Sequence, residues 1–446
     1  MAYTLEKPLT ATLPISVYQQ AMIEAACDPG TSVGYHQHMT IRWGFRIRPG
    51  LPARTLRRAF GKLVARHESL RLRFVERKGV WKAEVLVDHP TGVIVEDLTN
   101  LDEAAQKATI IARAGAPMTA LSEPMFEMII FRCGKGGDVL VTRVHHAIID
   151  GYSVKLLIED LLKFILSMPI GGSAPSHNEY IIHSQKRLGE RAEEKETFWK
   201  AQLLPLPEEL NIGRYAKGLP AYGPRTVGSS IRLDGILSFT QVLELERKAK
   251  EIGQSVFSLY CTAFSEAICE LANRNEVLMN YVMGRHDREM SRFVGVNVDL
   301  GMVKYTSDGS SLVERAKRVS HSISKMSPNL PSTTFLPGGV LDKAFSTSRT
   351  QSRRFLVHQA NVVSKLPTSS PFNKIFHTAM HSALSLGHVS LERFDLPGES
   401  ETEFELYLLI EPQKEGLNAN LIADSEGYSQ TELRDIAHAV VRQLGL

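Results

Sequence analysis

The sequence lacks the features that define several large classes of protein. Its four cysteines include no CxxC or other paired metal spacing, and each lies in an apolar stretch, so we expect buried, reduced thiols. No apolar run approaches membrane-spanning length, and the N-terminus has no signal-peptide core. We therefore expect a cytoplasmic protein with no membrane partner. The 52 basic and 49 acidic residues leave a formal charge of only +3, which argues against nucleic acid as a partner.

Signatures of common enzyme classes are also missing. The sequence has no nucleophile elbow, no phosphate-binding GxxxxGK[ST] loop, no dinucleotide fingerprint and no HExxH. His358, His377, His381 and His388 are scattered among expected strands, and we predict no metal site. Basic residues cluster at 57–73 (RRAFGKLVARHESLRLR), which we interpret as the polar face of a helix.

What the sequence does contain is a globular composition and one unusual local pattern. With 446 residues and an apolar fraction of 43%, it is expected to fold into two to three domains. The pattern is VTRVHHAIIDGYS, residues 141–153, in which a strand-like run ends in His145 and His146. Asp150 and Gly151 follow, and the next residues have helical apolar spacing.

The two histidines are expected to do different things. The turn signal GKGGD at 134–138 predicts a hairpin with residues 125–133, which places both histidines at the end of its second strand. Neighbouring side chains on a strand point to opposite faces, so one histidine can face a cavity while the other packs inward. Histidine suits proton transfer near neutral pH. The alternative interpretation is a core histidine and an Asp150 that caps the following helix.

The chain divides into two halves with similar element order. In the first half we predict helices at 13–27 (with Ser16 as N-cap), 52–70, 101–114 and after Gly151, strands at 38–48 and 93–96, and hairpins turning at 78–79 and 134–138. Residues 168–180 are rich in Gly, Pro and Ser and form the best linker candidate. The second half has strands at 227–233, 276–284 and around 374–423, with helices at 237–252, 254–272, 310–325 and 429–444. We predict domains at 1–175 and 176–446, with 176–215 as the crossing segment and a cleft or tunnel between similar lobes.

Several motifs resemble one family. HHAIIDG resembles the HHxxxDG signature of the chloramphenicol acetyltransferase superfamily, and above all of condensation domains of nonribosomal peptide synthetases. Residues 13–19 (LPISVYQ, with Ser16 and Gln19 in place), 65–74 (ARHESLRLRF), 198–203 (FWKAQL), 283–300 (with Arg285, Gly295 and Asn297 aligning) and the C-terminal strands are similar to further motifs of that family. The resemblance spans essentially the whole chain and implies a free-standing condensation domain.

The sequence departs from the family in its second half. The HQDxPFE motif is not recognisable at 325–337, and the NPL-type motif has only a weak candidate at 367–373. These departures bear on acceptor identity and carrier docking. The DFGWG motif of plant acyltransferases, the NVPGP-like segment of wax ester synthases, and the glutamate-bearing segment and GWF motif of the epimerases are all absent.

The resemblance implies both a fold and a set of roles. The fold is α+β (an α/β sandwich), with two chloramphenicol acetyltransferase-like lobes in a V-shaped pseudo-dimer and the active site in a tunnel between them. His146 is the catalytic base, and His145, Asp150, Arg285 and Gly151 are structural at the active site. Asp150 and Arg285 form a buried ion pair, which we favour over a triad role for Asp150.

The sequence offers alternatives for some roles and for the exact reaction. Gly151 either keeps the backbone slim beside the pantetheine arm or is an ordinary loop glycine. Ser153 either caps the helix or contacts the acyl carbonyl. Ser153, Asn297, Ser16 and Gln19 are candidates for contact with substrate or tunnel.

The family reaction transfers an acyl or aminoacyl group from a phosphopantetheine thioester of an acyl or peptidyl carrier protein to a small-molecule or carrier-bound amine. No metal or bound cofactor is expected, and a monomer is expected. The alternatives are an acyl-CoA-dependent or ester-forming acyltransferase and a non-catalytic docking domain. The intact HHxxxDG argues against the last. Fold cannot separate the three.

Overall fold

The structure is a computed structural model that describes residues 9–27, 33–89, 91–119, 121–123, 125–220, 228–284, 288–330, 339–340, 361–364, 384–386, 389–396, 401–402, 404–413 and 416–446. The chain forms two compact units. One comprises Met1–Gln185, Arg285–Asn297 and Thr368–Gly398, and the other comprises Lys186–Gly284, Val298–Pro367 and Glu399–Leu446. This division differs from the one predicted at 175/176, because two segments from the second half of the chain belong to the first unit.

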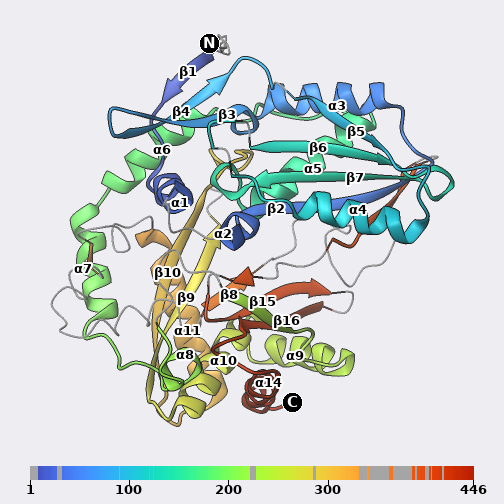
Figure 1. The fold of residues 1–446 in the computed structure, drawn as a ribbon. Helices are drawn as coiled ribbons and strands as arrows, with labels where there is room; N and C mark the ends of the chain where they lie inside the picture. Colours follow the sequence, from blue (N-terminus) through green and yellow to red (C-terminus); the bar gives the residue numbers. More distant parts are fainter. Residues whose placement is uncertain are drawn as a thin grey trace. The chain divides into compact units, whose positions relative to one another are not determined.

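A six-stranded sheet forms the centre of the first unit (Figure 1). Its order is β12-β13-β2-β7-β6-β5, and all neighbours are antiparallel except β5 and β6. The strands are β2 (Thr40–Arg48), β5 (Val93–Asp97), β6 (Phe126–Arg132), β7 (Asp138–His145), β12 (Leu384–Leu386) and β13 (Val389–Phe394). Strand β13 comes from late in the chain and pairs with β2, with Ser390 opposite Arg48 and Phe394 opposite Gly44.

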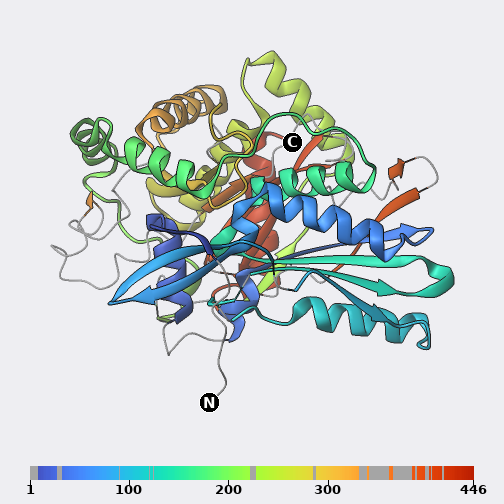
Figure 2. The same ribbon diagram turned by 90° about the horizontal axis from the view of Figure 1, so that it is seen from above.

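Helices cover both faces of this sheet, because its strands alternate apolar side chains between two cores. Met128 and Ile130 of β6 face a core shared with α3 (Ala53–Arg66) and α5 (Gly151–Ile165). Ile129 and Phe131 face a smaller core under α4 (Glu103–Gly115). Helices α3 and α5 lie side by side on their face (Figures 1 and 2).

A second, three-stranded sheet adjoins the first. It has the order β1-β4-β3 and consists of β1 (Leu9–Leu13), β3 (Leu72–Arg77) and β4 (Val80–Leu86). The predicted hairpin turns at Lys78 and Gly79, whose φ angles are 55° and 76°. Two successive residues with positive φ match the right-handed twist of the flanking strands, which is the reason for the glycine at this turn. The short helices α1 (Val17–Cys27) and α2 (Val33–His38) follow β1.

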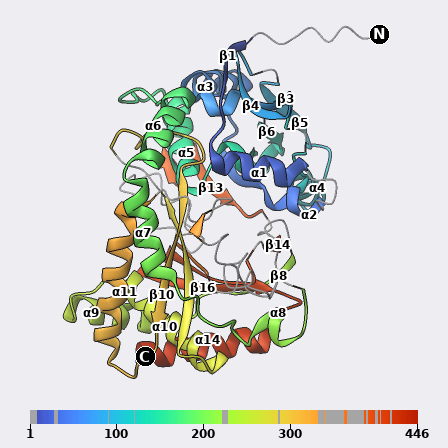
Figure 3. The same ribbon diagram turned by 90° about the vertical axis from the view of Figure 1, so that its left-hand side faces the viewer.

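The second unit is built on a seven-stranded sheet of order β10-β9-β11-β15-β16-β8-β14 (Figure 3). The strands are β8 (Gly228–Leu233), β9 (Glu276–Gly284), β10 (Val298–Thr306), β11 (Asn361–Ser364), β14 (Glu401–Thr402), β15 (Leu406–Gln413) and β16 (Gly416–Asp424). The helices are α7 (Ala192–Leu203), α8 (Gly213–Ala216), α9 (Phe239–Glu251), α10 (Val256–Ala272), α11 (Leu312–Met326) and α14 (Gln430–Leu444). Helix α10 is the central one: it contacts α9, α11 and α14 and buries Tyr260 and Phe264 in the core.

The structure bears on three sequence-based expectations. The proposed linker at 168–180 ends in helix α6 (His177–Gly189), since Tyr180 and Ile181 pack against residues of the 288–297 segment. Three cysteines are buried, but the prediction was wrong for Cys27, which is exposed because it is the last residue of α1. Among the described residues, no helix is both long and apolar enough to cross a membrane.

Candidate active site

The double histidine ends strand β7 and begins a turn. The backbone N–H of His145, the last residue of β7, donates to Met125 O at 3.0 Å. His146 starts a short 3-10 helix of one turn, His146–Ile148, and its N–H donates to Met39 O at 2.7 Å. His145 is fully buried, whereas the side chain of His146 is partly exposed. The two imidazoles therefore lie in different environments.

The His145 ring stabilises the turn that carries its neighbour. Its Nδ1 accepts a hydrogen bond from the backbone N–H of Ala147 at 3.1 Å, so in the neutral ring the proton resides on Nε2. Burial, with smaller contributions from His146 and His36, lowers the pKa of His145 to about 3. His145 is thus neutral throughout the physiological range.

His146 is partly exposed, and one of its ring nitrogens is buried. Its Nδ1 is buried and has no hydrogen-bond partner in the described part of the chain. Since residue 146 is partly exposed and Nδ1 is buried, Nε2 is the ring nitrogen that we assign to contact with a reactant. An imidazole nitrogen that meets the reactants is suited to act as a general base.

Gln19 fixes the turn from the other side. The backbone N–H of Ser16 donates to Gln19 Oε1 at 3.0 Å, and Ser16 Oγ accepts from the Gln19 N–H at 3.2 Å. This reciprocal pair caps α1 and leaves the Gln19 amide to donate to Ala147 O at 3.2 Å. Both side chains are buried. The polar groups of Ser16 and Gln19 are therefore used in hydrogen bonds within the protein. One of these bonds, from Gln19, reaches Ala147, the residue that follows His146.

Asp150 connects the start of α5 to a segment far along the chain. Its Oδ1 accepts from Ser153 N–H at 2.7 Å, which caps the helix, and its Oδ2 accepts from Asn297 N–H at 2.8 Å. Its own N–H donates to Gly295 O at 3.1 Å. The carboxylate is fully buried. Arg285, its predicted ion-pair partner, lies outside the described residues.

Ser153 forms a second connection to the same segment. Its Oγ donates to Gly295 O at 2.9 Å and accepts from Gly295 N–H at 3.1 Å, and the residue is fully buried. Gly295 has no room for a side chain, since a Cβ there would lie 2.2 Å from the Phe293 ring. The donor and acceptor of Ser153 are both used within the protein.

Gly151 and Asn297 are more exposed than the residues that connect α5 to the segment 293–297. Gly151, the first residue of α5, is exposed, and a Cβ placed on it would meet nothing within 4 Å. Packing within the fold therefore does not require glycine here. Asn297 is partly exposed and contributes its backbone N–H to Asp150.

The ARHESLRLRF stretch forms a buried polar network that sequence reasoning did not resolve. Asp160 Oδ2 of α5 accepts from Arg66 Nε at 2.8 Å and lies 3.0 Å from His67 Nε2. Arg292 Nη2 lies 4.0 Å from Asp160 Oδ1. Burial lowers the pKa of His67, so the ring is held neutral beside the carboxylate. In the sequence, the one indication of this network was Asp160, an acidic residue on the apolar face of helix α5.

Helix α6 supports the same segment from another side. Tyr180 stacks on Phe293 with ring centres 4.4 Å apart, and its hydroxyl donates to Val296 O at 2.6 Å. Glu68 Oε2 accepts from the His177 N–H at the first residue of α6, at 3.0 Å. Residues 293–297 are therefore held by α5 and α6 together.

Some predicted elements of the site fall outside the described residues. These are residues 367–373 and the histidines at 358, 377, 381 and 388, in addition to Arg285. Within the described part of the chain, no group of three or more His, Cys, Asp and Glu side chains is arranged to hold a metal ion.

Comparison with known proteins places this geometry in a family. A profile described as "Condensation domain" matches residues 12–445. The chain belongs to the condensation-domain family. Its HHxxxDG residues are His145 to Gly151, and the segment that bonds to them lies within residues 283–300, which resemble a further motif of the family. Trp199 of the FWKAQL motif is fully buried in the second unit and donates to Asn329 O at 3.0 Å.

Individual relatives are distant and much longer proteins. The chain is 28% identical to a linear gramicidin synthase component of Brevibacillus parabrevis over 286 residues, which is 62% of this chain and 6% of that protein. It is 25% identical to the dimodular nonribosomal peptide synthase of Bacillus subtilis over 333 residues, which is 69% of this chain and 13% of that protein. The chain thus spans only a small part of the length of the curated relatives it matches.

Solved structures of the family show the same fold. A four-domain nonribosomal peptide synthetase bound to AMP and glycine matches with a TM-score of 0.80 at 16% identity, over 99% of this chain and 33% of that one. The first condensation domain of the calcium-dependent antibiotic synthetase matches with a TM-score of 0.71 at 17% identity, over 98% and 96%. The predicted mixed α/β fold of the chloramphenicol acetyltransferase type is confirmed.

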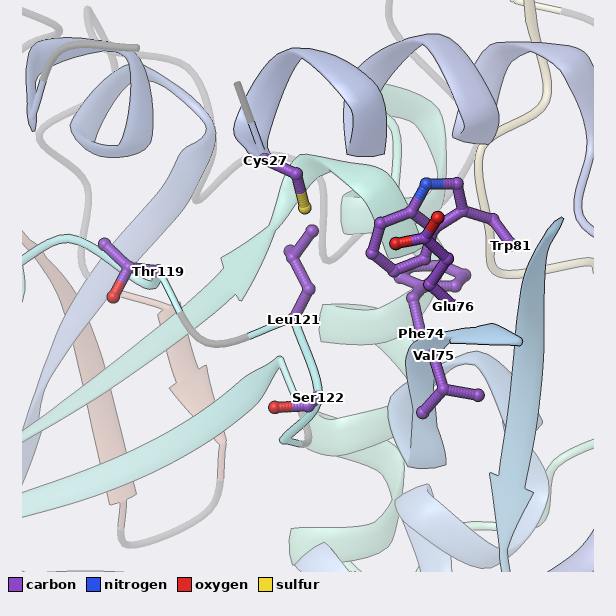
Figure 4. A pocket seen from close by; sticks show the side chains of 8 residues that line it. All are labelled: Cys27, Phe74, Val75, Glu76, Trp81, Thr119, Leu121 and Ser122. Atoms are coloured by element: carbon purple, nitrogen blue, oxygen red, sulfur yellow. The ribbon is translucent and has the colours of Figure 1, made fainter. Parts of the chain in front are cut away.

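A separate hollow of about 370 Å³ lies at the far end of α1 (Figure 4). Its lining is mostly apolar and contains no histidine or other HHxxxDG residue. The lining residues are Cys27, Phe74, Val75, Glu76, Trp81, Thr119, Leu121 and Ser122. The close-up shows the Cys27 side chain directed toward Leu121. Partial desolvation and the nearby Glu76 raise the pKa of the exposed Cys27 thiol, so this thiol is not activated as a nucleophile.

Proposed function

We propose that this chain is a condensing acyltransferase. It takes an acyl or aminoacyl group from the phosphopantetheine thioester of a carrier protein and joins it to an amine, forming an amide in natural-product biosynthesis. The observation that carries the proposal is His146: a partly exposed residue on a turn fixed by the buried His145 and Gln19, whose ring buries Nδ1 and so leaves Nε2 for the reactants.

His146 is the proton acceptor in this proposal. The amine nitrogen attacks the thioester carbonyl, the C–N bond forms, and Nε2 takes the proton that the nitrogen loses. The tetrahedral intermediate then breaks its C–S bond, and the imidazolium returns the proton to the departing thiolate. Positioned acid–base catalysis of this kind contributes typically about 10²–10⁴-fold to a rate.

The other predicted site residues position this base. His145 holds the Ala147 N–H and Gln19 holds the Ala147 carbonyl, so the residue after His146 is fixed on both sides. Asp150 and Ser153 fix the 293–297 segment beside the start of α5. In this proposal the Asp150 carboxylate also forms an ion pair with Arg285, in addition to the hydrogen bonds that it accepts from the backbone N–H groups of Ser153 and Asn297. Gly151 leaves the entry beside α5 unobstructed for the pantetheine arm.

The test is donor-dependent turnover. The purified chain is mixed with an acyl-loaded carrier protein and a panel of amines, and intact-mass measurement follows loss of the acyl group and formation of the amide. We expect turnover by the parent and by His438→Ala, an exposed control on α14, and loss of turnover in His146→Ala. Turnover with free acyl-CoA but not with the acyl-carrier protein would overturn the carrier-dependent assignment in favour of an acyl-CoA acyltransferase. Carrier binding without turnover of either donor would identify a docking domain.

A further inference from the structure

Helix α3 carries positive charge along its whole outward face. Its exposed positions are 54, 57, 58, 61, 62 and 65, which form one stripe of an α-helix. The helix, which lies at the surface of the first unit (Figure 2), contains no Asp or Glu. Four of the six exposed residues are cations, and they are called the basic strip: Arg54, Arg57, Arg58 and Lys62.

The basic strip has no counter-charge in the described part of the chain, where none of its four members forms an ion pair. Arg58 donates to Ser167 Oγ at 3.1 Å, and the Lys62 ammonium lies 5.8 Å from the centre of the Phe164 ring. Both of these partners are neutral. Many exposed arginines elsewhere are paired, such as Arg318 with Asp308 at 2.9 Å.

This arrangement works against the stability of α3. Arg54 and Arg58, and Arg58 and Lys62, are four residues apart, and like charges at this spacing repel on a helix. Arg54 also lies in the first turn, where the helix dipole disfavours a cation.

Gly61 adds a further cost, because glycine weakens a helix interior, and here a Cβ would meet nothing within 4 Å. The like charges and the glycine both weaken the helix, and no ion pair in the described part of the chain compensates for them. Such destabilising residues are expected at functional sites.

The shape of the strip indicates what it binds. Its residues are spread over about 12 Å of the helix axis from Arg54 to Lys62, which suits an extended row of acceptors better than one phosphate. None of the exposed large apolar side chains of the described residues belongs to α3, which argues against insertion into a membrane. A formal charge of +3 gives no broad basic field for nucleic acid. The partner that best matches the charge and length of the strip is therefore a row of carboxylates on the surface of another protein.

We propose that the basic strip docks an acidic face of the carrier protein that delivers the acyl group, with Gly61 allowing that face to approach the helix backbone. The inference rests on the proposed function, because the carrier is the macromolecule that the reaction requires. In this inference the basic strip binds the carrier protein and takes no part in the reaction. The carrier surface that contacts α3 must therefore contain carboxylates. Such charges act mainly on association rate and salt dependence.

The experiment measures the dissociation constant of the carrier protein, loaded with a non-hydrolysable acyl amide analogue, as a function of salt. The strip variant is Arg54→Gln, Arg57→Gln, Arg58→Gln and Lys62→Gln together. The control removes four exposed cations of the second unit: Lys250→Gln, Lys317→Gln, Lys325→Gln and Arg434→Gln. We expect the strip variant to bind roughly tenfold more weakly at low salt, with the difference vanishing at about 1 M salt, and the control to bind like the parent.

A second variant guards against a folding artefact. Gly61→Ala is expected to raise the melting temperature, because alanine favours the helix, yet to weaken carrier binding. Equal dissociation constants for parent and strip variant would overturn the proposal. So would tighter, strip-dependent binding of a double-stranded DNA oligonucleotide than of the carrier.

Turnover of a small acyl-pantetheine thioester separates this inference from the proposed function. We expect the strip variant to match the parent with this donor, because the strip does not touch the reacting atoms. Loss of that turnover in a variant that melts like the parent would place the strip in the reaction and overturn docking. If the parent turns over no donor but binds the carrier through the strip, the proposed function fails and the docking surface stands.

Discussion

Asp150 accepts a hydrogen bond at 2.8 Å from the backbone N–H of Asn297, a residue 147 positions later in the chain. The same carboxylate caps α5 through Ser153 N–H. One side chain therefore fixes the helix that follows HHxxxDG and the segment that lies beside it. Because both of these donors are backbone groups that need an acceptor, loss of the carboxylate has consequences for stability as well as for rate.

Replacing Asp150 is expected to destabilise the protein. Asp150→Ala leaves two backbone N–H groups without this acceptor, which costs about 2–5 kcal/mol in free energy of unfolding. Urea denaturation measures the difference. Asp102→Ala, which removes an exposed N-cap of α4, is the control and should cost about 1 kcal/mol. Equal losses for the two variants would show that the buried connection is no stronger than a surface cap.

Replacing His146 is expected to separate rate from stability. His146→Ala removes the nitrogen that is proposed to accept the proton, Nε2, and should lower kcat about 10²–10⁴-fold. The buried Nδ1 of its ring has no hydrogen-bond partner in the described part of the chain, so the melting temperature should stay within about 1–2 °C of the parent. A large fall in melting temperature would mean that the ring is structural.

Gln19 is expected to act as a positioning residue. Gln19→Met keeps the volume but removes the amide that holds Ala147 O, so the turn carrying His146 loses one of its supports. We expect kcat to fall on the order of tenfold, while the KM for the amine changes little. Gln20→Met is the matched control, because Gln20 is exposed and its side chain bonds to Glu24 on the same helix. A change in stability without a change in kcat would contradict the positioning role.

The second unit is expected to lose stability as the pH rises from about 4.5 to 7. Burial raises the pKa of the Glu405 carboxyl to about 7, although Arg214 partly offsets this. In this window the native carboxyl keeps a proton that the unfolded chain has released, so the free energy of unfolding falls with rising pH and levels off above 7. The contribution is on the order of 3 kcal/mol.

The Glu405 prediction is checked by urea unfolding at several pH values. Glu405→Gln resembles the protonated form and should remove this part of the slope. Glu426→Gln, an exposed carboxylate beside Arg214, should retain it. If the slope is the same in all three proteins, Glu405 does not titrate in this range.

Local patterns predicted most of the elements but not their long-range pairing. The turn at Lys78 and Gly79 and the hairpin that ends at His145 were predicted because turn chemistry and strand alternation are local signals. The pairing of β13 with β2 and the return of residues 285–297 to the first unit could not be, because register depends on contacts hundreds of residues apart.

The site shows the same contrast. HHxxxDG was recognisable as a spacing of residue types, and the capping of α5 by Asp150 was one of the interpretations that the sequence left open. The bonds of Ser153 to Gly295 and of Gln19 to Ala147 join side chains to backbone groups, which leave no trace in residue identity. Asp160 was detectable only as a charge on an apolar helix face.

The position of β13 has a consequence for how the chain folds as it is synthesised. The central sheet of the first unit lacks a neighbour for the outer edge of β2 until residues 389–394 have left the ribosome. For most of translation that edge can pair with a strand from another chain. A fragment ending at residue 175 would keep the edge open permanently, so we expect it to aggregate, whereas the full chain provides the strand that covers it.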